Sequence, residues 1–173
     1  EGPLMAKTRA VGAAGMVPSF GIAALLGLLR HPQLLREHAE TVDFIPVADD
    51  RLSKLRDLML EAAFTNAALD PDGLLTILRE KGAAALVEEL SLKRGLAFSF
   101  TRRDAEPERA CRELVLVIET LAARPELEAA LEAATARLKE AGDEAAFAEQ
   151  QRLRTARDEA DRQLATLIEN GAD

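Results

Sequence analysis

The side chains that could bind a metal ion or act as a nucleophile are few in this sequence. His31 and His38 are seven positions apart, and Glu37 and Glu40 lie close by. Imidazole and carboxylate groups on one face of a helix are common ligands of transition metals. Pro32 argues against one continuous helix here, because proline disfavours helical geometry at the residue before it. No zinc-ligand spacing is present, so we predict no metal, cofactor or catalytic site and no enzyme activity in this chain.

The one cysteine, Cys111, is the other candidate for covalent chemistry. It lies in an apolar helical pattern, and no histidine, aspartate or second cysteine is near it in sequence. We therefore expect Cys111 to be a buried packing residue. A single cysteine allows no internal disulfide, which fits a reducing cytoplasmic setting.

Composition predicts an all-α protein. The 173 residues are rich in helix-forming types, aromatic residues make up only 3%, and the net charge is −8. This charge disfavours non-specific nucleic-acid binding, and no sequence-specific nucleic-acid contact is expected. One short region is basic, and we interpret it as solvated charge at helix ends, with an acidic or nucleic-acid partner as the alternative. Its residues are Lys93, Arg94, Arg102 and Arg103.

An uncharged run near the N-terminus has some features of a signal peptide or membrane span. It follows Lys7 and Arg9 and extends from residue 10 to residue 29. Glycines and Pro18 interrupt it, and its apolar part, residues 22–29, is too short to cross a membrane. We expect no membrane partner, and we interpret residues 1–18 as a flexible lead-in.

The chain then divides into two expected units, a compact multi-helix bundle at 19–124 and an antiparallel helical hairpin at 125–173. In the bundle, Ser19 is expected to cap a helix over 20–30, and a shorter helix should follow Pro32. Residues 41–47 should form an extended linker that inserts Phe44 and Ile45 into the core. Asp49 or Asp50 is expected to cap a helix to about residue 68, and Asp70 to cap a helix from Pro71 to Lys81. A short helix is predicted over 83–92, with Phe98 and Phe100 as core anchors in the loop that follows.

The hairpin is predicted from its helix breakers. Pro107 begins a helix, and Pro125 interrupts the helical pattern because it cannot donate a hydrogen bond to the Leu121 carbonyl. We expect a kink or break there, which makes Arg124 and Pro125 a hinge. Gly142 supplies the turn, and Asp143 the cap, before a last helix over 144–169.

Antiparallel pairing about the turn places Leu153 near Ala130, while the last helix extends beyond its shorter neighbour. A small kink would let Ile118 and Leu121 cover its end, and a large kink would leave an exposed apolar patch there. We predict a partner-binding surface on this helix, from apolar residues at its two ends and arginines between them. The alternatives are an ordinary seam with a frayed end, and a solvated charged face with Arg154–Asp158 and Arg157–Asp161 pairs. The predicted partner-binding residues are Phe147, Arg157, Arg162, Leu164, Leu167 and Ile168.

The segment Leu25-Leu26-Gly27-Leu28-Leu29-Arg30-His31-Pro32 and the charged Ala/Leu/Glu/Arg-rich hairpin carry a family resemblance. With them, the chain after residue 17 resembles the C-terminal helicase-binding domain of bacterial DnaG-type DNA primases. That family has a helical bundle, a long connecting helix and a terminal hairpin in this order.

The resemblance implies that the hairpin docks on the N-terminal domains of the hexameric replicative helicase and that the bundle modulates the helicase. The zinc-binding and primer-synthesising polymerase domains of a full primase would lie upstream of such a domain. A structural or chaperone-like helical domain with a different protein partner is the alternative.

Overall fold

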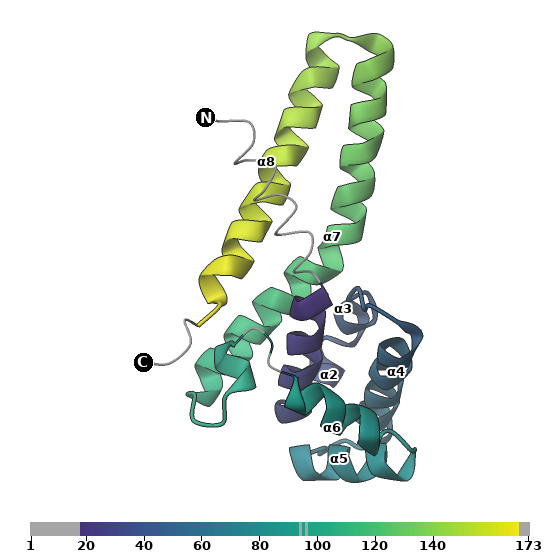
Figure 1. Cartoon of the computed structure of the whole chain (residues 1–173), viewed down its shortest axis with the longest axis vertical. Helices are drawn as coiled ribbons and strands as arrows, with labels where there is room; N and C mark the ends of the chain where they lie inside the picture. Colours follow the sequence, from purple (N-terminus) through teal and green to yellow (C-terminus); the bar gives the residue numbers. More distant parts are fainter. Residues whose placement is uncertain (1–17, 94, 96, 170–173) are drawn as a thin grey trace.

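A computed structural model describes residues 18–93, 95 and 97–169. This part of the chain is all-α and contains no strand, as predicted. The helices form a bundle from which a long hairpin projects (Figure 1). The predicted lead-in lies outside the described residues apart from Pro18, which is already helical.

The first helix, over residues 18–30, ends at the His31-Pro32 step. Ser19 lies inside this helix, so its predicted role as a cap is wrong. Two short helices follow, α2 (Gln33–Glu37) and α3 (Ala39–Asp43).

Gly27 lets the first helix lie close against the core. A β-carbon at this position would be 2.6 Å from Phe100 Cδ2 and 3.0 Å from the Leu114 side chain. The predicted core anchors Phe98 and Phe100 are confirmed, because both are fully buried with their rings stacked 4.8 Å apart. Phe98 immediately precedes η1 (Ser99–Thr101), and Phe100 lies within it.

The segment after α3 differs from the prediction. Residues 41–43 are helical, and only one of the two expected core residues is buried, with Ile45 1% and Phe44 62% exposed. Phe44 is the C-cap of α3 and stays exposed, whereas the next residue, Ile45, enters the core. The Ile45 carbonyl accepts a hydrogen bond from Arg56, which fixes the chain direction.

Three further helices complete the bundle, namely α4 (Asp50–Thr65), α5 (Pro71–Glu80) and α6 (Ala84–Leu92). The predicted caps are confirmed. The Asp49 carboxylate accepts from the Leu52 N–H at 3.0 Å, and the Asp70 carboxylate accepts from the Gly73 N–H at 2.6 Å.

The hairpin consists of α7 (Pro107–Ala141) and α8 (Glu144–Leu167). Gly142 adopts the left-handed conformation with φ 61°, and Asp143 caps α8 through the Ala146 N–H at 2.8 Å. Of the kink or break expected at Pro125, the break is absent, because α7 continues through it. The helix does change direction between its half on the bundle and its half in the hairpin (Figure 1). Packing on both sides explains this continuity, since Leu121 is buried in the bundle and Leu131 in the hairpin.

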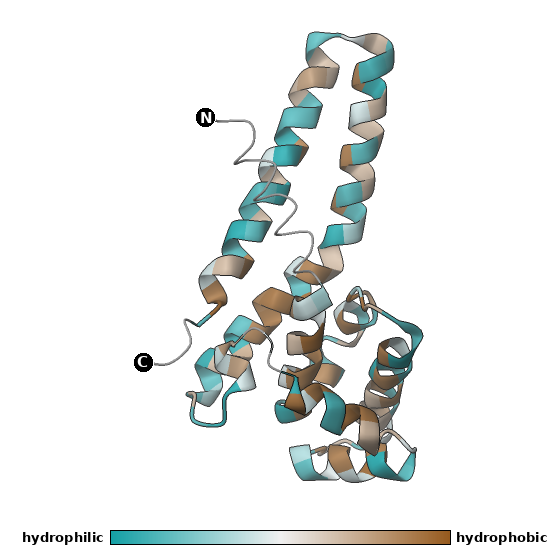
Figure 2. Ribbon diagram, viewed as in Figure 1, coloured by the Kyte–Doolittle hydropathy of each residue, from teal (hydrophilic) through white to brown (hydrophobic). Residues whose placement is uncertain are grey.

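Hydrophobic residues gather on the bundle and on the half of α7 that crosses it, while the projecting hairpin is largely hydrophilic (Figure 2). Among the described residues, no helix is both long enough and apolar enough to cross a membrane.

Candidate partner-binding surface

The distal half of the hairpin has a small core of its own. Leu131 and Ala134 of α7 pack against Leu153 of α8, and Leu127 and Ala130 cover them in part. Leu153 and Ala130, predicted to approach each other, belong to this one cluster. A hydrogen bond of 3.0 Å from Gln150 to Thr135 adds a polar link between the helices.

Polar contacts join the helices beside Pro125. The Arg124 guanidinium donates to the Asp161 carboxylate and lies 3.4 Å from Glu128. Asp161 therefore pairs across the hairpin and not with Arg157 of its own helix, which instead lies 3.6 Å from Asp158. The predicted hinge residues Arg124 and Pro125 thus lie in a continuous helix that α8 braces.

The other end of α8 is docked on the bundle. Leu164 is 1% exposed and belongs to the same core as Ile118 and Leu121. Its prediction as part of an exposed patch is wrong, because the unbroken α7 keeps its N-terminal half beneath α8. Leu167 and Ile168 are half-buried against the same core.

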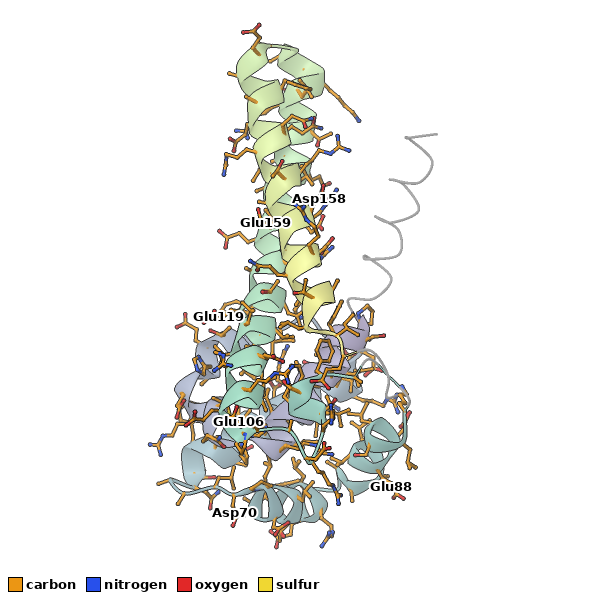
Figure 3. All side chains as sticks on the ribbon, turned by 90° about the vertical axis from the view of Figure 1, so that its left-hand side faces the viewer. Asp70, Glu88, Glu106, Glu119, Asp158 and Glu159 are labelled. Carbon is orange, nitrogen blue, oxygen red and sulfur yellow. The ribbon has the colours of Figure 1, made fainter. Side chains whose placement is uncertain are left out.

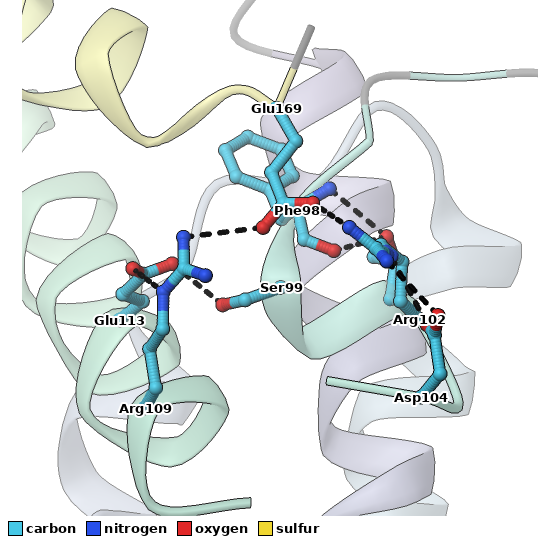
Figure 4. A network of polar contacts seen from close by, with 8 residues as sticks. Phe98, Ser99, Arg102, Asp104, Arg109, Glu113 and Glu169 are labelled. Carbon is cyan, nitrogen blue, oxygen red and sulfur yellow. Dashed lines mark hydrogen bonds and ion pairs between the residues drawn. The ribbon is translucent and has the colours of Figure 1, made fainter. Parts of the chain in front are cut away.

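A polar network then fixes the residue after this apolar contact (Figure 4). The Glu169 N–H donates to the Ala97 carbonyl at 2.8 Å. The Glu169 carboxylate accepts from Arg102 and, at 3.2 Å, from Arg109. Hydrogen bonds to Asp104 and Glu169 raise the pKa of Arg102.

The network continues into α7, where Glu113 accepts from Arg109 at 2.9 Å and from the Ser99 hydroxyl at 2.5 Å. Sequence reasoning did not find the role of Glu169, because its partner Arg102 is 67 positions away. In the sequence, only the basic cluster that contains Arg102 indicated this contact.

The predicted partner-binding residues that are exposed to solvent lie on α8. Phe147, near the turn, is 53% exposed, and Arg162 is exposed as predicted. Arg157 is half-buried beside a groove of about 290 Å³ that Leu116, Leu127 and Ala160 also line. Figure 3 shows the charged side chains that surround the hairpin, with Asp158 and Glu159 on α8.

The fold brings Cys111 to His31, with 3.5 Å between the thiol sulfur and Nδ1. Burial and then Glu37 raise the pKa of the Cys111 thiol, while burial and then Arg30 lower the pKa of His31. Both shifts favour the neutral forms, which is the reverse of an activated thiolate–imidazolium pair. Cys111 is half-buried and packs against the core. Among the described residues, no three potential metal ligands come together.

The described residues of the basic cluster are exposed, as expected for solvated charge. Lys93, Arg102 and Arg103 line a cleft together with Arg30, while Arg94 lies outside the described residues.

No protein-family model matches this chain, and searches of curated proteins and solved structures found no significant match.

Proposed function

We propose that this chain is the helicase-docking domain of a bacterial replicative DNA primase. The order of a helical bundle followed by a terminal hairpin supports this proposal, with α7 serving both as the helix that leaves the bundle and as the first arm of the hairpin. Its role would be recognition in the bacterial cytoplasm, with primer synthesis performed by domains elsewhere in the primase.

One observation carries the proposed docking surface. The base of the hairpin is fixed to the bundle by Leu164 and Glu169, whereas its tip presents Phe147 to solvent. A large apolar side chain held away from the main core on a braced support is typical of an interaction anchor.

Arginines extend this surface along α8. Arg162 is exposed, and Arg157 lies at the groove beside α7 with only a long 3.6 Å approach to Asp158. Both guanidinium groups can therefore pair with carboxylates of a partner, and arginine is enriched among residues that dominate binding energy. We place the helicase contact on Phe147, Arg157 and Arg162, with Leu167 and Ile168 supporting α8 from beneath.

The direct experiment is calorimetric titration of the whole chain into the replicative helicase hexamer of the same organism, and into its isolated N-terminal domains. Saturable binding to both, together with altered helicase ATPase activity, is the expected result. A hexameric ring ATPase of unrelated function serves as the control. Absence of binding to the helicase would contradict the proposal and favour the structural or chaperone-like alternative.

A further inference from the structure

A second surface lies on the bundle, away from the hairpin tip. It is a cleft of about 760 Å³ between the first helix, α5, α6 and the segment that leads to η1. One wall is apolar and includes Leu26, Leu29, Leu75 and Val87. Concave sites of a few hundred to a thousand cubic ångströms with an apolar wall are typical of small-molecule binding.

The rim of this cleft is cationic although the chain carries a net charge of −8. Arg30, Lys93, Arg102 and Arg103 contribute four positive charges, and Asp72 contributes one negative charge. In the part of the chain that the structure describes, no carboxylate is within ion-pair distance of Arg30, Lys93 or Arg103. Three of the four cations that line the cleft therefore have no carboxylate partner among the described residues, whereas Arg102 pairs with Asp104 and Glu169.

Arg30, which is half-buried, lines the same cleft as the exposed Arg103. Burial, and then repulsion from Arg103, lower the pKa of Arg30. An anion placed between the two guanidinium groups would relieve that repulsion. The cleft is thus prepared electrostatically for a negatively charged group.

We propose that this cleft binds a small phosphorylated ligand of nucleotide size, with its phosphates on Arg30, Arg103 and Lys93 and its organic part against Leu26 and Val87. A phosphate group carries three acceptor oxygens and more than one negative charge near neutral pH, so it can bind several guanidinium forks at once. The apolar wall gives the rest of such a ligand a surface to cover.

Two larger partners fit less well. A single-stranded nucleic acid would extend beyond the cleft along a chain whose net charge is −8, which disfavours further phosphates. An acidic peptide would bring only one charge and two oxygens with each carboxylate, so several of its residues would have to reach the cationic rim at once.

The site also shares a residue with the base of the hairpin. Arg102 lines the cleft and at the same time holds Glu169. A phosphate that draws Arg102 toward the cleft would weaken this contact, so ligand binding should loosen the end of α8. This consequence does not depend on the proposed helicase partner.

The test is calorimetric titration of the whole chain with magnesium-free ATP, inorganic tripolyphosphate and adenosine. We expect ATP to bind more tightly than tripolyphosphate, adenosine not to bind, and ATP affinity to fall as salt is added. Arg30→Gln and Arg103→Gln should each weaken ATP binding by about tenfold or more, the effect of losing one charged hydrogen bond. Arg137→Gln removes the same charge from the exposed surface of the hairpin and should leave the affinity unchanged.

Amide chemical shifts provide a second measurement that does not depend on variants. ATP should shift the signals of Ser19, Leu75 and Val87, which line the cleft, and also that of Glu169. Failure of both ATP and tripolyphosphate to bind at millimolar concentration would overturn the proposal. So would shifts confined to other surfaces, tighter binding of oligothymidylate, or tighter binding of a peptide of alternating glutamate and leucine.

Discussion

The two ends of the hairpin use similar sequence for different purposes. At the base, Leu164 enters the core of the bundle and Glu169 is held by two arginines. Toward the tip, Leu153 meets only Leu131 and Ala134 in a separate, smaller cluster. Leucines at comparable helical positions therefore serve attachment at one end and presentation at the other.

The origin of this difference is the unequal length of the helices. α7 has 35 residues and α8 has 24, so the first part of α7 crosses the bundle before α8 meets it. The end of α8 returns to that crossing point and packs on a surface already supported by other helices. The tip has no such support, which leaves Phe147 open to solvent.

The largest expected effect on the free energy of unfolding comes from truncating Leu164, and it should exceed the effect of truncating Leu153. Leu164→Ala should lower the free energy of unfolding by about 3–5 kcal/mol, because it opens a cavity in a fully enclosed site. Leu153→Ala should cost about 2 kcal/mol, because its smaller surroundings can relax. Chemical denaturation of both variants measures the difference, and an equal or larger loss at Leu153 would contradict the comparison.

The next largest effect on the free energy of unfolding is expected at Pro125, which lies between the base and the tip of the hairpin. Pro125→Ala should raise the free energy of unfolding by about 1–2 kcal/mol, because it restores the hydrogen bond to the Leu121 carbonyl inside α7. Pro107→Ala is the matched control, since proline at the first helical position already suits the helix and its loss should not stabilise the protein.

Denaturant unfolding and solution scattering test this prediction together. With a helix that is continuous in both proteins, the scattering profiles of Pro125→Ala and the unmodified chain should agree. A changed profile, or a loss of stability in Pro125→Ala, would show that Pro125 acts as a hinge after all.

The smallest stability effect concerns the ion pairs at the base. Glu169→Gln should destabilise the protein by about 1 kcal/mol at low salt, because it weakens the partly buried contacts with Arg102 and Arg109. Glu159→Gln, on the exposed face of α8, should change stability by less than about 0.5 kcal/mol. Urea unfolding at low and high salt compares them, and an equal effect of both substitutions would remove Glu169 from the account of attachment.

Features set by neighbouring residues could be predicted from the sequence. Asp49, Asp70 and Asp143 cap the helices that their positions indicated, and Gly142 makes the turn. These outcomes depend on backbone groups within a few positions of each residue.

Features set by packing could not be predicted in the same way. The continuity of α7 at Pro125 depends on cores on both sides of it, and the burial of Leu164 depends on that continuity. Glu169 and Arg102 meet only because the hairpin folds back on the bundle. Phe44 was expected inside because of its residue type, but the preceding helical turn directs it outward.

The central claim is that the exposed tip of the hairpin, held out by its docked base, contacts the replicative helicase. The most direct test compares the helicase affinity of Phe147→Asp with that of Phe64→Asp, since Phe64 lies on the bundle and is 60% exposed. Phe147→Asp should weaken binding by about thirtyfold or more, as expected for an interface anchor worth at least 2 kcal/mol, while Phe64→Asp should bind like the unmodified chain. Equal affinities of the two variants, with both correctly folded, would contradict the claim.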